Sequence, residues 1–545
     1  MTRLGVDIGA RFIDMLAWGD GGVIGHAKEP VGAHLPDDVL AGLRGLDIAP
    51  GALAEIRIAS TGFLNCLHDA QGGGDLPRIG LIASAGFEDV AVLGRQDRLS
   101  LYDPVTRVAT PDHLIDCVEG VSARMDAGGG EISPVDQGQV ARIAEGFAAR
   151  GITAVAVCLL HAHVDGRHER AVAEALSAAA PGLTVSLSHR IDAEPREFER
   201  TVSTVLDAWL RITALPALDA LRARLRAAGF AGRWVWGDGR GVLTAAPTSL
   251  VPLIAGGPAA SLRAAALAAE GDAVALDIGS RTTDIALVRG GAPALTEGGV
   301  LAGLPIRGGR VDLESLAIGG AQAVAGSRYT LDDALIATGL MPGQSDCPTS
   351  EAAQLLGVAS QALAEAITRH ATRRNTDPTR AGLVLTGGAG ALMGPGIAEA
   401  LGLSQVVLPH LPAIAGAVGL AQVPRRSETI TRIDAALDEV TADMLTAKGE
   451  GTVHARIAPR PRMPELEVPV DPERLDGLAE DYHAAYRARY GIAPQGPGHV
   501  TQLCTRTDDL TGALARDMDE GEVVAPKGWR AVAIPGGTRL ERVGG

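Results

Sequence analysis

The stretch Asp7-Ile8-Gly9-Ala10-Arg11-Phe12-Ile13-Asp14 returns 270 residues later as Asp277-Ile278-Gly279-Ser280-Arg281-Thr282-Thr283-Asp284. In each copy, a short turn that contains glycine joins one apolar run to a second one. Apolar runs separated by such a turn predict a β-hairpin. Two copies, each at the start of a plausible domain, indicate an internal duplication.

The residue types in the repeat suit the binding of a phosphate chain. A glycine lets the backbone approach a phosphate closely, and the N–H groups of a turn then donate hydrogen bonds to its oxygens. An aspartate at the end of a strand can hold hydrated Mg²⁺, which keeps several waters and takes few protein carboxylates. Two such hairpins facing each other would grip the two ends of a triphosphate. The alternative interpretation is a pair of ordinary hairpins whose aspartates only cap turns.

A third glycine-rich turn follows a strand-like apolar run at residues 384–390. Residues 395–401 after it are predicted to be helical, and a helix N-terminus suits an anion. We therefore expect Gly387, Gly388 and Gly390 to contact a nucleotide, although a tight turn without a ligand has the same sequence. With strand-like and helix-like segments alternating, the chain is predicted to be α/β. We expect duplicated actin/hexokinase-like (RNase H-like) domains around an ATP cleft, with a small C-terminal α+β domain.

Three domains are predicted, at residues 1–200, 201–425 and 426–545. Pro424-Arg425-Arg426 marks the boundary before the last of them, and Pro459, Pro461 and Pro464 indicate a proline-punctuated linker. Apolar residues at helical spacing predict two helices with a buried stripe. These stripes are Phe198, Val202, Val205 and Trp209 in the first helix, and Leu475, Leu478, Tyr482 and Tyr486 in the second.

Bulk composition excludes several classes of protein. The formal net charge of −16 without a compensating basic patch argues against nucleic-acid binding. The five cysteines are widely spaced and include no C-x-x-C, so neither a disulfide framework nor a zinc site is indicated. We find neither the pattern of a signal peptide nor a charge-free apolar run of about 18 residues. We therefore expect a cytoplasmic protein that does not bind membranes.

Further segments resemble the hydantoinase A/5-oxoprolinase family, which includes subunits of ATP-dependent hydantoinases and of acetone and acetophenone carboxylases. The similar segments are Gly80–Ile82 with Gly86–Val90, Gly94–Arg98 with Leu101–Asp103, Val155–His161 with His168 and Glu169, Ser186–Ser188 with Arg196–Thr201, and Tyr482–Gly491. The resemblance spans nearly the whole chain. It implies that ATP phosphorylates the carbonyl oxygen of the substrate, after which a nucleophile can attack the carbonyl carbon.

For a cyclic amide or imide of the hydantoin or 5-oxoproline type, the implied enzyme is an ATP-dependent amidohydrolase that uses ATP and Mg²⁺. A carboxylase subunit acting on a ketone is the alternative. A non-catalytic partner subunit is the third hypothesis. The family also implies a larger B-type subunit as partner, so we expect a hetero-oligomer.

The resemblance and the repeat together imply roles for particular residues. The predicted catalytic residues are Asp7, Asp277, Asp284 and Thr282, with Asp7 and Asp277 on the side of the metal. The predicted nucleotide contacts are Gly9, Arg11, Gly279, Arg281, Thr283, Gly387, Gly388 and Gly390. A polar loop with Arg95 and Gln96 can recognise a carboxylate or carbonyl of the substrate, since arginine supplies two parallel donors; the alternative is a solvated loop.

The hairpins depart from the family pattern at the same two places. Ala10 and Ser280 stand where the family has glycine, and Arg11 and Arg281 stand where it has threonine. An arginine at each turn can neutralise phosphate charge, take the place of the metal, or block the nucleotide. His161, His163 and His168 cluster after a predicted strand, but their spacing fits no single helix face, so a metal site there is only an alternative.

Overall fold

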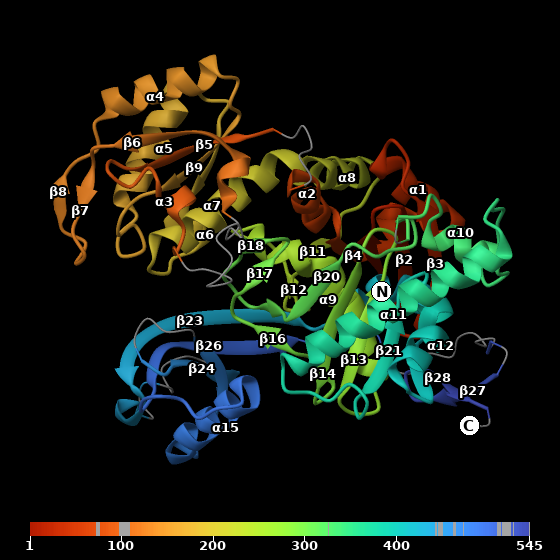
Figure 1. The fold of residues 1–545 in the computed structure, drawn as a ribbon. Coiled ribbons are helices and arrows are strands. Elements are labelled where there is room, and N and C mark those ends of the chain that lie inside the picture. Colours follow the sequence, from red (N-terminus) through yellow and green to blue (C-terminus); the bar gives the residue numbers. More distant parts are fainter. Residues whose placement is uncertain are drawn as a thin grey trace.

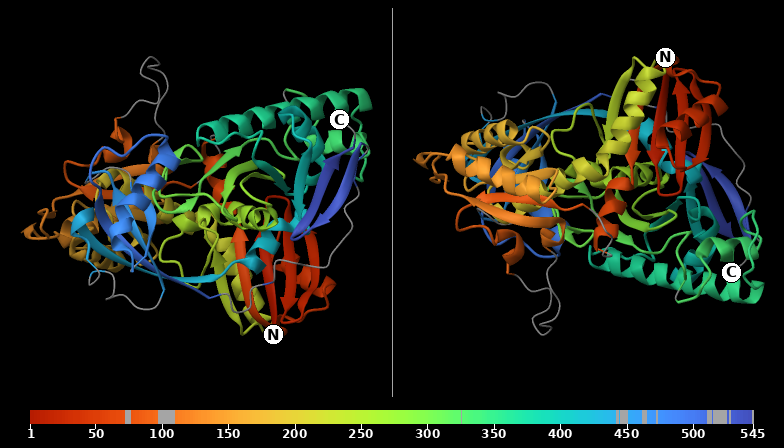
Figure 2. Two further views of the ribbon diagram at one scale, coloured as in Figure 1. Left: turned by 90° about the horizontal axis from the view of Figure 1, so that it is seen from below. Right: turned by 90° about the horizontal axis from the view of Figure 1, so that it is seen from above.

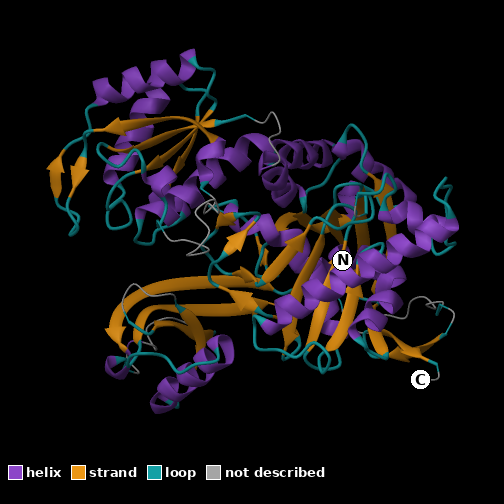
Figure 3. Ribbon diagram, in the orientation of Figure 1, coloured by secondary structure: helices purple, strands orange, loops and turns teal. Residues whose placement is uncertain are grey.

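The computed structural model describes the chain except for residues 72–76, 97–109, 325, 442–443, 445–450, 461–464, 472, 510–513, 515–524, 527 and 544–545. Two large mixed sheets stand side by side, and a smaller α/β unit projects from one end (Figure 1). Helices cover the sheets, as the colouring by secondary structure shows (Figure 3). The predicted α/β class is confirmed.

The first large sheet has ten strands in the order β25-β24-β26-β23-β12-β11-β4-β1-β2-β3. At one end of this sheet, β3, β2 and β1 form an antiparallel meander, and β1, β4 and β11 run parallel. These strands are β1 (Thr2–Ile8), β2 (Phe12–Gly19), β3 (Gly22–Pro30), β4 (Leu53–Ser60), β11 (Arg233–Gly237) and β12 (Leu243–Thr244). The helices α1 (Leu35–Gly45), α2 (Gly62–Gln71) and α8 (Leu215–Ala227) accompany them.

The second large sheet repeats this arrangement. Strands β15, β14 and β13 are antiparallel, while β13, β21 and β22 are parallel. They are β13 (Ala273–Ile278), β14 (Thr283–Arg289), β15 (Ala292–Pro293), β21 (Gly382–Thr386) and β22 (Gln405–Pro409), and β20 (Leu313–Leu316) pairs with β14. The helices are α10 (Leu331–Ala337), α11 (Thr349–Thr372) and α12 (Gly390–Leu401). The shared strand order agrees with the duplication inferred from the repeat.

A loop of small strand pairs lies between β15 and β20. It comprises β16 (Leu295–Thr296), β17 (Val300–Leu301), β18 (Leu304–Pro305) and β19 (Arg310–Val311). β16 pairs with β19, and β17 pairs with β18.

The two predicted hairpins have the same geometry. Asp7 faces Asp14 across β1 and β2, and Asp277 faces Asp284 across β13 and β14. The amide of Gly9 donates to the carbonyl of Phe12, and the amide of Gly279 donates to the carbonyl of Thr282. Both N···O distances are 2.9 Å. β1 is buried on both faces, with Leu4, Val6 and Ile8 in the main apolar core and Asp7 on the opposite face. Because the two aspartates of a hairpin lie directly opposite each other, both point to the same face.

The projecting unit is built on four parallel strands in the order β10-β9-β5-β6. They are β5 (Ile79–Ser84), β6 (Ile115–Val121), β9 (Ala154–Cys158) and β10 (Thr184–Leu187). Its other elements are α3 (Val90–Leu93), β7 (Arg124–Met125), β8 (Glu131–Ser133), α4 (Gln137–Ala149), α5 (Arg167–Ala179), α6 (Ser188–Ile191) and α7 (Glu197–Thr213). The predicted stripe of α7 is buried, with exposures of 0–7%.

The C-terminal segment belongs to both large sheets. Its strands β23 (Arg425–Ala436), β24 (Thr452–Ala458), β25 (Leu466–Val470) and β26 (His499–Asp509) extend the first sheet, and β27 (Trp529–Ile534) and β28 (Gly537–Arg542) extend the second. Helix α15 (Leu478–Tyr490) packs on β25, and Gly491 ends it in a left-handed conformation. Figure 2 shows this segment lying along the body from one end to the other.

The sheets therefore cross the predicted boundaries at residues 200 and 425. β11 and β12, predicted in the second domain, lie in the first sheet, and β27 and β28 join the second. Strand-like periodicity marks an element but does not say which strand it pairs with, because the partner is distant in sequence.

Two glycine-rich helices cross between the large sheets. They are α9 (Gly256–Ala268) and α13 (Ala415–Gln422). Residues 251–268 are long and apolar enough to span a membrane, but 83% of this segment is buried inside the protein, which accounts for its apolar character. A Cβ on Gly419 would lie 1.8 Å from the carbonyl oxygen of Ala260, so the helices approach as closely as glycine allows.

This crossing predicts unequal effects of the same substitution in two helices. Gly419→Ala should lower the free energy of unfolding by about 1–3 kcal/mol, because the added methyl group forces the helices apart. Gly146→Ala, in exposed α4 with open space at the Cβ position, should instead raise it by about 0.5–1 kcal/mol through helix propensity. Urea unfolding of both variants measures the difference, and equal effects would contradict the close approach.

Candidate functional site

Four aspartates and one lysine meet where the two hairpins face each other. Asp7 and Asp277 end the first strand of each hairpin, and Asp14 and Asp284 lie opposite them. The Lys28 Nζ from β3 is 2.6 Å from Asp14 Oδ1 and donates to the carbonyl of Ala413 at 2.9 Å. Carboxylates from both halves of the duplication thus share one region, as the sequence predicted for Asp7, Asp277 and Asp284.

Burial makes these carboxylates unusually basic. Burial, then the neighbouring charges of Asp14 and Asp277, raises the pKa of Asp7 well above its usual range. Burial raises the pKa of Asp14 to about 6 even though Lys28 opposes the shift, and it raises that of Asp284 to about 7. The pKa of Asp277 is also raised by burial, against hydrogen bonds from the hydroxyls of Ser261 and Thr386. The site can therefore hold protons near neutral pH.

Two carboxylate oxygens in the cluster are buried without a hydrogen-bond partner among the described residues: Asp7 Oδ1 and Asp284 Oδ1. Asp7 is 8% exposed and Asp284 is 4% exposed. Buried acceptors are normally satisfied, so these oxygens are suited to a bound cation or a donor group of a ligand. Among the described residues, no group of three or more possible metal ligands occurs. That donor set fits hydrated Mg²⁺, which takes one or two carboxylates, better than a caged metal.

The third predicted turn lies against the second hairpin. A Cβ on Gly387 would be 2.3 Å from the carbonyl oxygen of Ile278 and 2.7 Å from Asp277 Oδ1, so only glycine fits there. Gly387 has a φ of 85°, and Gly390 begins α12. A Cβ on Gly388 would meet open space. The turn is thus placed beside the aspartates, with room on one side.

The turn residues of the second hairpin are partly occupied by the protein itself. The Thr283 hydroxyl donates to the carbonyl of Ile318 at 2.6 Å, and Thr283 is fully buried. The Gly279 amide donates to the Thr282 carbonyl, and the Gly279 carbonyl accepts from Gly320. The hydroxyl of Thr283 therefore anchors the loop around residue 318, and the amide of Gly279, like that of Gly9, is used inside its own turn.

The twin arginines pair across the cleft in a reciprocal way. Arg11 of the first hairpin pairs with Asp332 in α10 of the second half, with Nη1–Oδ2 at 2.7 Å. Arg281 of the second hairpin pairs with Asp69 in α2 of the first half, with Nη2–Oδ1 at 2.5 Å and Nη1–Oδ2 at 3.2 Å. Each phosphate-type turn is therefore tied to the opposite half by its own arginine. We call these two ion pairs the cross-cleft pairs.

Arg95 and Gln96 lie elsewhere. Arg95 lines a cavity of about 1940 Å³ between the projecting unit, the small strand pairs and the C-terminal strands, and none of the described residues that line it belongs to either hairpin. Its Nε is 2.7 Å from Glu199 Oε1. Gln96 is exposed, with a φ of 54°. The neighbouring motif at residues 97–103 is outside the described residues.

The histidine cluster has protein partners in place of a metal. Arg200 Nη1 is 2.7 Å from His163 Nδ1, and His168 Nε2 is 2.7 Å from Glu131. Among the described residues no metal-binding cluster includes them.

Sequence reasoning missed two members of the site. Asp14 was visible in the repeat as the counterpart of Asp284. Lys28 had no such signal, because it lies 14 residues beyond Asp14 on the next strand and reaches the site only through sheet pairing.

Family models match most of the chain. The description "Hydantoinase/oxoprolinase N-terminal region" fits residues 3–180, and "Hydantoinase/oxoprolinase" fits residues 200–332 and 333–427. The chain belongs to the hydantoinase/oxoprolinase family. The two family regions together contain both hairpins and the third turn, so the family identity and the site geometry coincide.

Relatives with printed functions differ in their reactions. The caprolactamase subunit alpha of Pseudomonas jessenii is 24% identical over 81% of this chain and 73% of its own length. The acetophenone carboxylase gamma subunit of Aromatoleum aromaticum is 30% identical over 43% of this chain and 34% of its own. An uncharacterized protein of Methanocaldococcus jannaschii is 26% identical over 80% of this chain and 75% of its own length.

Two solved structures share the fold. The ATP-dependent caprolactamase of Pseudomonas jessenii has a TM-score of 0.75 at 19% identity and covers 100% of both chains. The nucleotide-free acetone carboxylase has a TM-score of 0.73 at 18% identity and covers 97% of this chain and 91% of its own. These similarities confirm the fold of the family for this chain.

The raised pKa of Asp284 predicts how stability changes with pH. The native state holds this proton more tightly than the unfolded state, so its stabilising contribution is present below about pH 4 and is lost as the pH rises through about 7. Asp284→Asn removes the titration. Relative to the parent, the variant should therefore gain up to about 4 kcal/mol of stability between about pH 4 and 8, at 1.36 kcal/mol per pKa unit.

Urea unfolding at several pH values measures this gain. Asp20→Asn is the control, because the N-terminal amine and Arg3 lower the pKa of Asp20 and its pH trend should have the opposite sign. Parallel pH profiles of the parent and Asp284→Asn would refute the shift.

The cross-cleft pairs predict a change in cleft opening. Exposed ion pairs each contribute about 0–1 kcal/mol, so Arg11→Met with Arg281→Met should raise the open population several-fold and increase the radius of gyration in small-angle X-ray scattering. High salt should shift the parent in the same direction. Arg380→Met, which removes an exposed pair within one half, is the control. An unchanged radius in the double variant would show that the pairs do not hold the halves together.

Proposed function

We propose that this chain is an ATP-dependent enzyme subunit that activates the carbonyl group of a cyclic amide or imide, of the hydantoin or 5-oxoproline type, by phosphorylation. The observation that carries the proposal is the cluster of four aspartates, with Asp7 and Asp284 buried and Asp14 and Asp277 partly buried, which meets Lys28 where the two duplicated hairpins face each other. Membership of the hydantoinase/oxoprolinase family supports it, as does a caprolactamase subunit among its relatives.

The chemistry follows from the stability of an amide. An amide oxygen is a poor leaving group, and phosphorylation converts it into a good one. The carbonyl oxygen attacks the γ-phosphorus, the bond to ADP breaks with its electron pair on ADP, and the ring nitrogen loses its proton. Water then adds to the activated carbon, and the ring C–N bond breaks with its electron pair and a proton going to nitrogen, which leaves an acyl phosphate and an amine. A second water hydrolyses the acyl phosphate and releases phosphate. The sum is ring amide plus ATP plus two waters giving the open-chain acid and amine, ADP and phosphate.

The described side chains can have separate roles in this reaction. Phosphoryl transfer depends mainly on positioning and on neutralising charge. Lys28 is the cation inside the cluster, and the glycine turns beside Asp277 leave room for a phosphate chain. Asp284, with a pKa of about 7, can hold or release a proton near neutral pH. Asp7 and Asp277 would hold Mg²⁺, which supplies further charge neutralisation when bound.

Two other functions have specific support. A carboxylase role is favoured by the acetophenone carboxylase relative, because its first step would be the same phosphorylation of a carbonyl oxygen. A non-catalytic role is favoured by the twin arginines, since each turn is tied to a carboxylate of the opposite half. We also propose a B-type partner subunit, because two of the relatives are themselves named as subunits. A cytoplasmic location is a separate proposal.

Phosphate release with different carbonyl compounds tests the proposal. The chain, alone and co-purified with a candidate B-type subunit, is mixed with Mg·ATP and either hydantoin, 5-oxoproline, caprolactam, acetone or acetophenone. Stimulation by a ring amide without added bicarbonate supports the hydrolase; stimulation only by a ketone with bicarbonate supports the carboxylase. If no nucleotide binds in either preparation, the enzyme hypothesis fails.

Substitutions in the cluster test the roles of its members. Asp277→Asn and Lys28→Met should each lower kcat by at least about 100-fold, since each removes charge from the transfer site. Asp20→Asn, on an exposed turn at the other end of β2, should leave kcat unchanged. Circular dichroism checks that the variants are folded, and full activity of Asp277→Asn would remove that residue from the site.

A further inference from the structure

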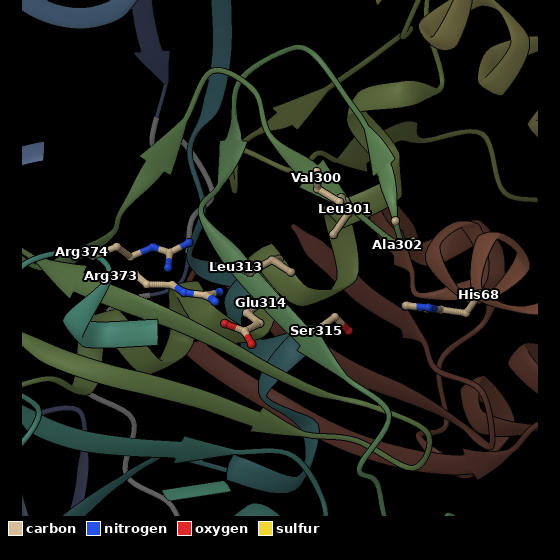
Figure 4. A pocket seen from close by; sticks show the side chains of 10 residues that line it. His68, Val300, Leu301, Ala302, Leu313, Glu314, Ser315, Arg373 and Arg374 are labelled. Atoms are coloured by element: carbon tan, nitrogen blue, oxygen red, sulfur yellow. The ribbon is translucent and has the colours of Figure 1, made fainter. Parts of the chain in front are cut away.

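A second, smaller cavity lies beside the aspartate cluster. Its volume is about 620 Å³. The side chains of Val300 and Leu301 in β17 line one part of it, and His68 from α2 faces Ser315 of β20 across it (Figure 4). The cavity therefore has an apolar wall, a polar end at His68 and Ser315, and a charged side formed by Glu314, Arg373 and Arg374. The two halves of the duplication both contribute to it.

The polar end is connected to the cluster by a row of side chains on one face of the second sheet. Asp277 lies opposite Asp284 across β13 and β14, and Asp284 lies opposite Ser315 across β14 and β20. Residues directly opposite each other in an antiparallel sheet point to the same face and are in contact range. The row therefore runs from the predicted phosphate turn through Asp284 to the wall of the cavity.

Two polar atoms at this end lack partners. Asp284 Oδ1 and His68 Nε2 are buried without a hydrogen-bond partner among the described residues, whereas the Ser315 hydroxyl faces Asp284 and opposes the rise in its pKa. Asp284 itself is 96% buried, since its exposure is 4%. Burying unsatisfied groups is unfavourable unless a ligand satisfies them. Burial and the nearby Arg281 lower the pKa of His68, so its imidazole is neutral and can donate one hydrogen bond.

The position of His68 depends on a cross-cleft pair. His68 immediately precedes Asp69, whose carboxylate pairs with Arg281 of the second hairpin. This ion pair fixes the end of α2 over the second half of the molecule. Arg281 thereby positions His68 at the cavity. This contact gives a structural explanation for the presence of arginine at this position of the second hairpin.

From these contacts we infer that the smaller cavity binds the carbonyl compound that receives the phosphoryl group, with Ser315 and His68 contacting its polar edge and Asp284 standing between it and the nucleotide. The inference rests on the proposed function. The apolar wall at Val300, Leu301 and Leu313 suits the carbon skeleton of a small ring. The carbonyl oxygen attacks the γ-phosphorus, ADP leaves with the electron pair of the broken bond, and the ring N–H proton passes to water.

Thiol labelling tests occupancy of the cavity without requiring turnover. Arg373→Cys places a thiol on an exposed position that lines the smaller cavity and not the larger one, and Ile132→Cys (66% exposed, in β8) is the control. Hydantoin, 5-oxoproline and caprolactam are each offered, with a nonhydrolysable ATP analogue present, during reaction with a maleimide. At least one should slow labelling of Arg373→Cys several-fold and leave Ile132→Cys unchanged. Equal labelling rates with all three ring amides would overturn the inference.

Kinetics separate the two cavities. Ser315→Ala and His68→Gln should raise the KM for the active ring amide about tenfold or more while leaving the Kd of ATP unchanged. Arg380→Met, in an exposed ion pair of the second half that lines neither cavity, should change neither. If Arg95→Met, in the larger cavity, raises this KM while Ser315→Ala and His68→Gln do not, the larger cavity is the acceptor site and the inference is wrong.

Different results would contradict the proposed function and the inference about the cavity. The proposed function fails if the parent chain does not bind ATP, or if no ring amide stimulates phosphate release. The labelling experiment still decides in that case, because protection of Arg373→Cys depends only on binding in the smaller cavity.

Discussion

The site depends on the burial of carboxylates at the ends of two facing hairpins. Asp7 and Asp284 are buried, Asp14 and Asp277 are partly buried, and one lysine cannot neutralise all four carboxylates. Removing a carboxylate from water disfavours its charged form, which is why the pKa of every one of the four is raised. Carboxylates whose pKa is strongly raised by burial are typical of functional sites. The oxygens of Asp7 and Asp284 that lack a hydrogen-bond partner among the described residues indicate where a ligand would bind.

Close packing by glycine makes this burial possible. Gly416 of α13 lies directly against the Asp7 carboxylate, where a Cβ would be 1.8 Å from Oδ2. Gly387 stands in the same relation to Asp277 in the other half. The crossing of α9 and α13 extends this principle to the join between the halves, since Gly419 meets the backbone of Ala260. Small residues thus set the distance between the two hairpins, and the distance between the hairpins sets the cleft.

The twin arginines give the duplicated halves a reciprocal link. In the sequence they read as changes to a phosphate turn, with three possible consequences. In the structure each one reaches a carboxylate in the opposite half, at Asp332 or Asp69. One arginine also positions the helix end that carries His68. The departure from the family pattern is therefore compatible with a working cleft, because the arginine side chains point to partners outside the aspartate cluster.

Some of this protein is determined by the sequence alone. The duplication, the two hairpins, the third glycine turn and the buried stripe of α7 follow from local patterns, because turns, strand alternation and helical spacing are properties of neighbouring residues. Asp7, Asp277 and Asp284 could be chosen for the same reason. Tertiary structure alone decided which strands share a sheet, and this moved β11, β12, β27 and β28 across the predicted boundaries. It also decided that Arg11 meets a residue 321 positions away and that Arg281 meets one 212 positions away. Local pattern carries no record of such partners, since they are set by how the two sheets and the helices between them pack.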